Sequence, residues 1–111
     1  MSTTLDSMST EQKVTMVMMT ILEAIVYELD REFMVRYRKA IDTTKDPADR
    51  MRIDIIFSDK VGELRQAGLI TKTSQEIRAK ASEIVAQEPV EKWYGCATKY
   101  ASQHAIYWVH L

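Results

Sequence analysis

The run Val14–Leu29, VTMVMMTILEAIVYEL, decides the fold because it predicts a helix that is apolar on nearly all of its sides. Its polar positions are few, namely Thr15, Thr20, Glu23 and Glu28. A surface helix needs only one apolar stripe, so a helix of this composition has to be covered on several sides. We expect the rest of a small domain to supply one covering layer and a second chain to supply another.

The helix that contains this run is expected to be long. No glycine or proline occurs before Pro47, and Ser9 with Gln12 has the spacing of a capping box, so we place the helix from about Thr10 to about Ile41. Residues 1–9 are expected to form a flexible tail and residues 10–111 a single helical domain. One apolar seam follows spacings of three and four through Val14, Val17, Met18, Ile21, Ile25, Leu29, Phe33, Tyr37 and Ile41.

A second apolar set lies away from this seam, at Met16, Met19, Val26 and Met34. Methionine adapts its shape and is over-represented at interaction surfaces, although it also fills ordinary cores. We expect these positions to face a second chain, and we expect aromatic side chains to add binding anchors. The residues predicted for the dimer interface or the partner interface are Met16, Met19, Val26, Tyr27, Phe33, Met34, Tyr37 and Trp108.

A second helix is predicted from about Pro47 to Ala67. Asp46 suits the N-cap position, Pro47 suits the first helical turn, and Gly68 suits a left-handed residue after the C-terminus. The expected buried stripe is Ile53, Ile56, Val61, Leu64 and Ala67. The β-branched run Ile53–Phe57 leaves a short strand as the alternative.

Two more helices complete the prediction. Thr73 and Glu76 have capping-box spacing before a helix over about Ser74–Gln87. A fourth helix is expected to start at Pro89 and to reach close to the C-terminus. The sequence therefore predicts an all-α fold, a small four-helix domain with one long N-terminal helix that is dimeric.

Composition favours a soluble protein of the cytoplasm. The chain has 111 residues, of which 46% are hydrophobic and 28% charged, and its net charge is −1. This balance does not favour nucleic acid or an anionic membrane as a partner. The single cysteine, Cys96, excludes an intrachain disulfide. No signal peptide is recognisable, and the apolar run is too short for a membrane span.

Few residues are candidates for chemistry. Cys96, Tyr100 and His104 would share one face of a helix, but residues eight apart lie about 12 Å apart along the axis, too far for a nucleophile and its base. Asp42, Asp46 and Asp49 lack the spacing of a calcium loop, and no paired zinc ligands occur. We therefore expect no enzyme activity, no metal and no cofactor.

A small helical DNA-binding regulator is the alternative function. The basic stretch from Arg31 to Lys45 contains Arg36, Arg38 and Lys39 and could contact phosphates. The segment Leu64–Ile70, LRQAGLI, resembles the end of a recognition helix in winged helix-turn-helix regulators. The residues that follow, however, predict another helix and not a β-wing, and a helix C-cap explains the same letters. Binding to nucleic acid is therefore less favoured than binding to protein.

The chain length, the single cysteine, the long first helix and the absence of a catalytic motif resemble small bacterial anti-activators, in particular the QslA-like quorum-sensing anti-activators of pseudomonads. The resemblance implies a helical dimer that binds the ligand-binding domain of a LuxR-type transcription factor. It further implies that binding prevents the factor from dimerising and from binding DNA. Together with the residues, it predicts a non-enzymatic regulatory module that forms a homodimer through Val14–Leu29 and covers an apolar patch of a protein partner.

Overall fold

A computed structural model describes residues 7–105 of the chain. The predicted Trp108 anchor lies outside these residues. Within them the fold is helical and its only β-pairing is an isolated bridge between Ile70 and Ala105, so the all-α class is confirmed. The elements are α2 (Thr10–Leu29), α3 (Arg31–Thr43), α4 (Pro47–Gln66), α5 (Ser74–Gln87), a short 3-10 helix (Val90–Lys92) and α6 (Trp93–His104).

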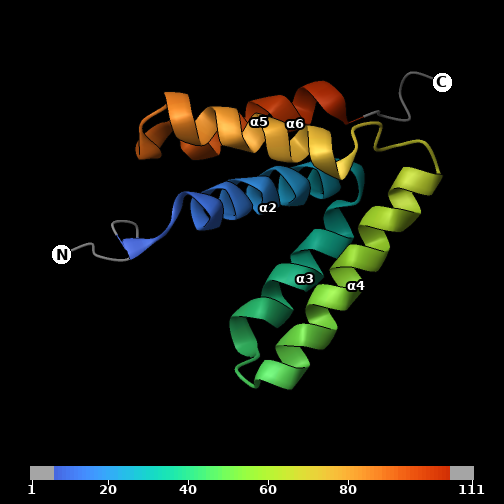
Figure 1. Cartoon of the computed structure of the whole chain (residues 1–111). Coiled ribbons are helices and arrows are strands. Elements are labelled where there is room, and N and C mark those ends of the chain that lie inside the picture. Colours follow the sequence, from blue (N-terminus) through green and yellow to red (C-terminus); the bar gives the residue numbers. More distant parts are fainter. Residues whose placement is uncertain (1–6, 106–111) are drawn as a thin grey trace.

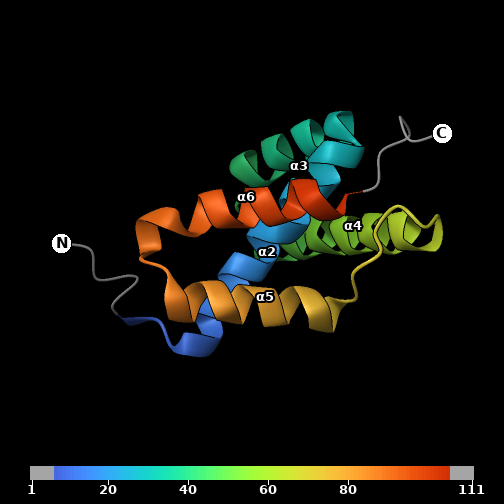
Figure 2. The same cartoon turned by 90° about the horizontal axis from the view of Figure 1, so that it is seen from above.

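The helices form two parts that share α2. In one part, α2 packs against α5 and α6, which lie side by side and run in opposite directions (Figures 1 and 2). In the other part, α3 and α4 form an antiparallel hairpin that projects away from α5 and α6 (Figure 1). We call this hairpin the α3–α4 arm.

The apolar character of α2 is explained by its central position. Its buried residues are Val14, Val17, Ile21, Leu22, Ile25 and Val26. Side chains from α5 and α6 complete this core, among them Ile77, Ala81, Ile84, Ala97 and Ala101. For these six residues the chain itself supplies the cover, and Val26, which was expected to face a second chain, belongs to the core.

The expected continuous helix from Thr10 to Ile41 is wrong, because the chain breaks at Asp30. This residue is not helical, with φ −151° and ψ 79°. Its side chain accepts a hydrogen bond from the Phe33 amide and so caps a new helix. A short acidic side chain can compete with the helix for backbone groups in this way. The expected four helices are therefore five α-helices within the described residues.

The α3–α4 arm has its own small aromatic contact. Tyr37 of α3 packs on Phe57 of α4 with ring centroids 4.8 Å apart, and Phe33 stacks on Tyr37. Val61 and Leu64 continue the buried face of α4. Phe33 and Tyr37, from the second half of the predicted seam, therefore pack within the arm.

The predicted helix ends are mostly confirmed. Both capping boxes form, at Ser9 with Gln12 and at Thr73 with Glu76. The Asp46 side chain accepts from the Asp49 amide ahead of α4, and Gly68 has φ +80° after it. The Ile53–Phe57 segment is helical, not a strand.

Two details of the later helices differ from expectation. Ile56 and Ala67 are exposed, and Phe57 takes a buried place on α4 instead. The last helix begins at Trp93 after the short 3-10 turn and ends at His104, because Ala105 is extended and pairs with Ile70.

Candidate functional site

The break at Asp30 creates the candidate site, because it turns α3 away from the direction of α2. The Asp30 amide donates to the Val26 carbonyl over 2.7 Å and closes α2. Its Oδ1 accepts from the Phe33 amide over 3.1 Å and opens α3. Its Oδ2 pairs with Lys60 Nζ of α4 over 2.7 Å, which fixes the arm to the turn.

A groove lies in the angle between α2 and α3 and is closed on a third side by α6. Its volume is about 610 Å³. Its lining residues are Thr20, Glu23, Ala24, Tyr27 and Glu28 of α2, Met34, Val35 and Arg38 of α3, and Tyr94 and Thr98 of α6. We call it the α2–α3 groove. Three helices thus contribute one wall each.

The groove presents large apolar and aromatic side chains to solvent. Tyr94 is 67% exposed, Val35 is 57% exposed, and Tyr27 is also exposed. Met34 is only 2% exposed and therefore forms part of the floor. Side chains that gather aromatic and aliphatic surface around a hollow are typical of protein-binding sites, where a few such anchors provide most of the affinity.

Charged groups lie at the sides of the groove. Arg38 Nη1 of α3 pairs with Glu23 Oε1 of α2 over 3.6 Å. Burial raises the pKa of Glu23, and the Arg38 charge partly opposes this shift. Arg31 donates to the Tyr27 hydroxyl over 2.8 Å and lies over its ring. These contacts hold both walls, and they place one carboxylate and one guanidinium beside the apolar surface.

The structure brings together only some of the residues predicted for an interface. Tyr27 and Met34 line the α2–α3 groove. Val26 and Tyr37 are buried in the chain's own core, as is most of Met34. Met16 is exposed on α2 outside the groove lining, and Met19 and Phe33 are partly buried against the core.

Sequence reasoning missed Val35 and Tyr94 as members of one site. Val35 lies off the apolar seam and directly before the charged Arg36, so an apolar side chain there is the available signal for a functional position. Tyr94 follows the buried Trp93, so only one of the two aromatic residues can face the core. Their proximity depends on the turn at Asp30, which periodicity alone does not reveal.

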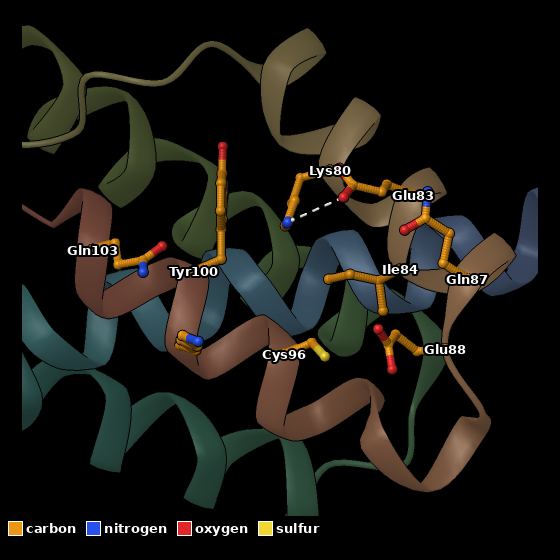
Figure 3. A pocket seen from close by; sticks show the side chains of 9 residues that line it. Lys80, Glu83, Ile84, Gln87, Glu88, Cys96, Tyr100 and Gln103 are labelled. Atoms are coloured by element: carbon orange, nitrogen blue, oxygen red, sulfur yellow. Dashed lines mark ion pairs between the residues drawn. The ribbon is translucent and has the colours of Figure 1, made fainter.

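A second hollow of about 300 Å³ lies between α5 and α6 (Figure 3). It contains Cys96 and Tyr100, and Lys80 pairs with Glu83 at its side over 3.5 Å. Tyr100 packs on the His104 ring with centroids 4.5 Å apart and lies under Lys80. Of the predicted trio, Tyr100 and His104 are therefore in ring contact, and Cys96 and Tyr100 pack against the core. Burial raises the pKa of Tyr100 and lowers that of His104.

Two cations of the basic stretch from Arg31 to Lys45 are engaged within the chain. Arg31 is engaged with Tyr27, and Arg38 is engaged with Glu23. Binding to a nucleic-acid backbone relies on Lys and Arg side chains that neutralise phosphates, and Arg38 is already paired with a carboxylate. The structure therefore favours the α2–α3 groove over this stretch as the candidate site.

Over residues 7–105, no cluster of three or more His, Cys, Asp or Glu side chains is placed to hold a metal ion. None of the described helices combines the length and the apolar composition needed to cross a membrane. Comparison with protein-family models, with curated proteins and with solved structures finds no match to this chain.

Proposed function

We propose that the chain is a non-enzymatic regulatory protein that binds an amphipathic helix of a partner protein in the α2–α3 groove. The observation that carries this proposal is the exposure of Tyr27, Val35 and Tyr94 around a hollow of about 610 Å³. An amphipathic helix binds such grooves through apolar side chains spaced three and four residues apart. Glu23 and Arg38 at the sides would select a helix with charged residues beside its apolar stripe.

Occlusion is the proposed mechanism. A partner helix whose apolar stripe lies in the groove is no longer available for the partner's own association. The resemblance to quorum-sensing anti-activators supports a transcription factor of the LuxR type as that partner. Binding would then prevent the factor from dimerising, and the factor would no longer bind DNA. In this proposal each molecule of the protein inhibits by remaining bound to a partner molecule, and it catalyses no reaction.

Photo-crosslinking tests the groove as the contact surface. A photoreactive amino acid at Tyr94 should crosslink the partner, because this side chain is 67% exposed within the groove lining. The same group at Val90 serves as the matched control, because Val90 is exposed outside the lining. Mass spectrometry of the Tyr94 product should identify an amphipathic helix. Equal crosslinking from both positions would contradict the assignment.

A charge in the groove tests the mechanism. Val35→Glu should abolish partner capture and leave the helical circular dichroism unchanged, because Val35 is exposed and forms no part of the core. With a purified LuxR-type regulator, the wild-type protein should reduce the regulator's DNA binding and Val35→Glu should not. Inhibition that persists in Val35→Glu would refute the groove. Direct binding of the chain to duplex DNA at low salt would instead favour the DNA-binding alternative.

A further inference from the structure

The outer face of α4 is the second unusual surface of the molecule. Its core face carries Phe57, Val61 and Leu64, which are buried against the rest of the chain. The opposite face carries a stripe at alternating spacings of three and four, which places its members on one side of the helix. We call it the α4 outer stripe, and it consists of Ala48, Met51, Ile55, Ser58 and Gly62.

Large apolar side chains are exposed on this stripe. Met51 is 64% exposed and Ile55 is 54% exposed. Among the described helices α4 packs chiefly on α3, and Figure 1 shows it at the outer edge of the arm. Met51 and Ile55 lie one turn apart, so their exposed apolar surfaces adjoin, and adjoining apolar surface of this kind indicates a contact with another protein surface.

Gly62 is an independent sign of such a contact. It lies within α4 and has helical neighbours on both sides, where glycine is unfavourable compared with alanine. Beyond its own turn of helix, a Cβ atom at this position would meet no atom within 4 Å, so no contact among residues 7–105 requires a glycine. Glycine in a helix permits the close approach of a second backbone.

The flanking charges indicate which surface fits the stripe. Arg52 and Asp59 lie two helical turns apart on the same side of it, and both are exposed. In a parallel pair of α4 helices, each flank faces the opposite flank of the second helix, so Arg52 and Asp59 would not meet. In an antiparallel pair, Arg52 of each copy lies beside Asp59 of the other, and Met51 then lies within about 3 Å along the axis of the level of Gly62. Both charge and size are then complementary.

We propose that two copies of this chain associate through the α4 outer stripe, with their α4 helices antiparallel about a twofold axis. An isologous contact requires a surface that is complementary to itself, and this stripe meets that requirement. Arg52 pairs with Asp49 over 3.0 Å in the single chain, but both side chains are more than half exposed. Such a pair is weak enough to be exchanged for Asp59 of the second copy.

Light scattering with chromatography, at tens of micromolar protein, tests the proposal. The wild-type chain should have the mass of a dimer, and Ile55→Glu should have the mass of a monomer. Val35→Glu is the matched control, since it also adds a carboxylate to an exposed aliphatic position but lies in the α2–α3 groove. A monomeric wild type, or a dimer that tolerates Ile55→Glu, would overturn the proposal.

Charge reversal tests the antiparallel register. Arg52→Glu and Asp59→Arg should each weaken self-association by about tenfold or more, because each places like charges together. The double variant Arg52→Glu/Asp59→Arg should restore it. Gly62→Leu should preserve helicity and abolish the dimer. If the double variant remains monomeric while folded, or if Gly62→Leu still dimerises, this arrangement is wrong.

The two surfaces can fail separately. Ile55→Glu should become monomeric and still capture the partner in the groove, whereas Val35→Glu should lose the partner and remain dimeric. A variant pair with these opposite results supports both surfaces. If both variants lost the partner and both remained dimeric, the α4 contact between copies would be wrong. Crosslinking from Tyr94 would then test the groove.

Discussion

The Asp30 carboxylate contacts two elements at once, because Oδ1 accepts from the Phe33 amide of α3 and Oδ2 pairs with Lys60 of α4. The hydrogen bond from Lys60 is the largest cause of the lowered pKa of Asp30. A single side chain therefore ends one helix, caps the next and holds the arm. The shape of the α2–α3 groove depends on this residue.

Asp30→Ala should lower the free energy of unfolding by about 1–2 kcal/mol, mainly through the lost helix cap. Asp30→Asn retains a capping oxygen and should be less damaging. Urea denaturation measures both, with Asp42→Ala, an exposed aspartate of α3, as the control. Equal stability of wild type and Asp30→Ala would show that the cap does not hold the turn.

The same residue gives a pH dependence of defined sign. Because the folded-state pKa of Asp30 is lowered from 3.8, its stabilising contribution is complete above that value and is lost as pH falls through the folded pKa. The stability advantage of wild type over Asp30→Asn should therefore shrink below about pH 4. An advantage that stays constant down to the acid transition would contradict the assigned shift.

Met34 and Met16 are the same residue type but differ in burial, and therefore in their contribution to stability. Met34 is 2% exposed, so Met34→Ala should cost roughly 2–5 kcal/mol of unfolding free energy. Met16 is exposed, so Met16→Ala should change it by less than about 0.5 kcal/mol. Thermal and urea unfolding of the two variants provide the comparison, and similar losses would refute the assignment of Met34 to the core.

At the scale of the element, helix ends were predictable because their signals are local. Asp46 with Pro47, Thr73 with Glu76, and Gly68 each act within one turn of the chain. The break at Asp30 was not predictable from periodicity, since Leu29 and Phe33 keep the spacing of an unbroken seam. The Asp30 carboxylate caps the next helix at Phe33 and also pairs with Lys60, which is distant in sequence.

Replacing Gly62 within α4 and Gly68 after its C-terminus by alanine should change the free energy of unfolding in opposite directions. Gly62→Ala should raise stability by about 0.5–1 kcal/mol, because alanine is the better helix former and the space is open. Gly68→Ala should lower it by about 1–2 kcal/mol, because φ is +80° there. Denaturation at protein concentrations too low for self-association makes the comparison. Stabilisation by both substitutions would contradict the left-handed geometry.

At the scale of the whole molecule, burial is unevenly distributed. Six residues of α2 are buried, whereas α3 buries Met34 and Tyr37 and α4 buries three residues. The apolar excess of α2 was visible in the sequence, but which helices cover it was not, because that depends on how α5 and α6 return to it. For this reason Tyr27 and Met34 are the groove residues that the sequence predicted, whereas Val35 and Tyr94 were missed.

Native-state hydrogen exchange should reveal this difference. Amides of the α3–α4 arm should exchange through a partial opening of lower free energy than the opening that exposes α2, α5 and α6, because the arm has fewer buried apolar contacts. Exchange followed by mass spectrometry at the peptide level resolves the two groups. Equal protection of α4 and α2 would indicate that the molecule opens as one unit.

The position of the α3–α4 arm between α2 and α5 has a kinetic consequence. The central helix must find α5 and α6 across residues 30–73, and closing a long loop slows the formation of such contacts. The arm itself is a local hairpin whose helices are joined by residues 44–46. If it forms first, it shortens the effective loop, so the arm contributes to the speed at which the core assembles as well as to the site that it shapes.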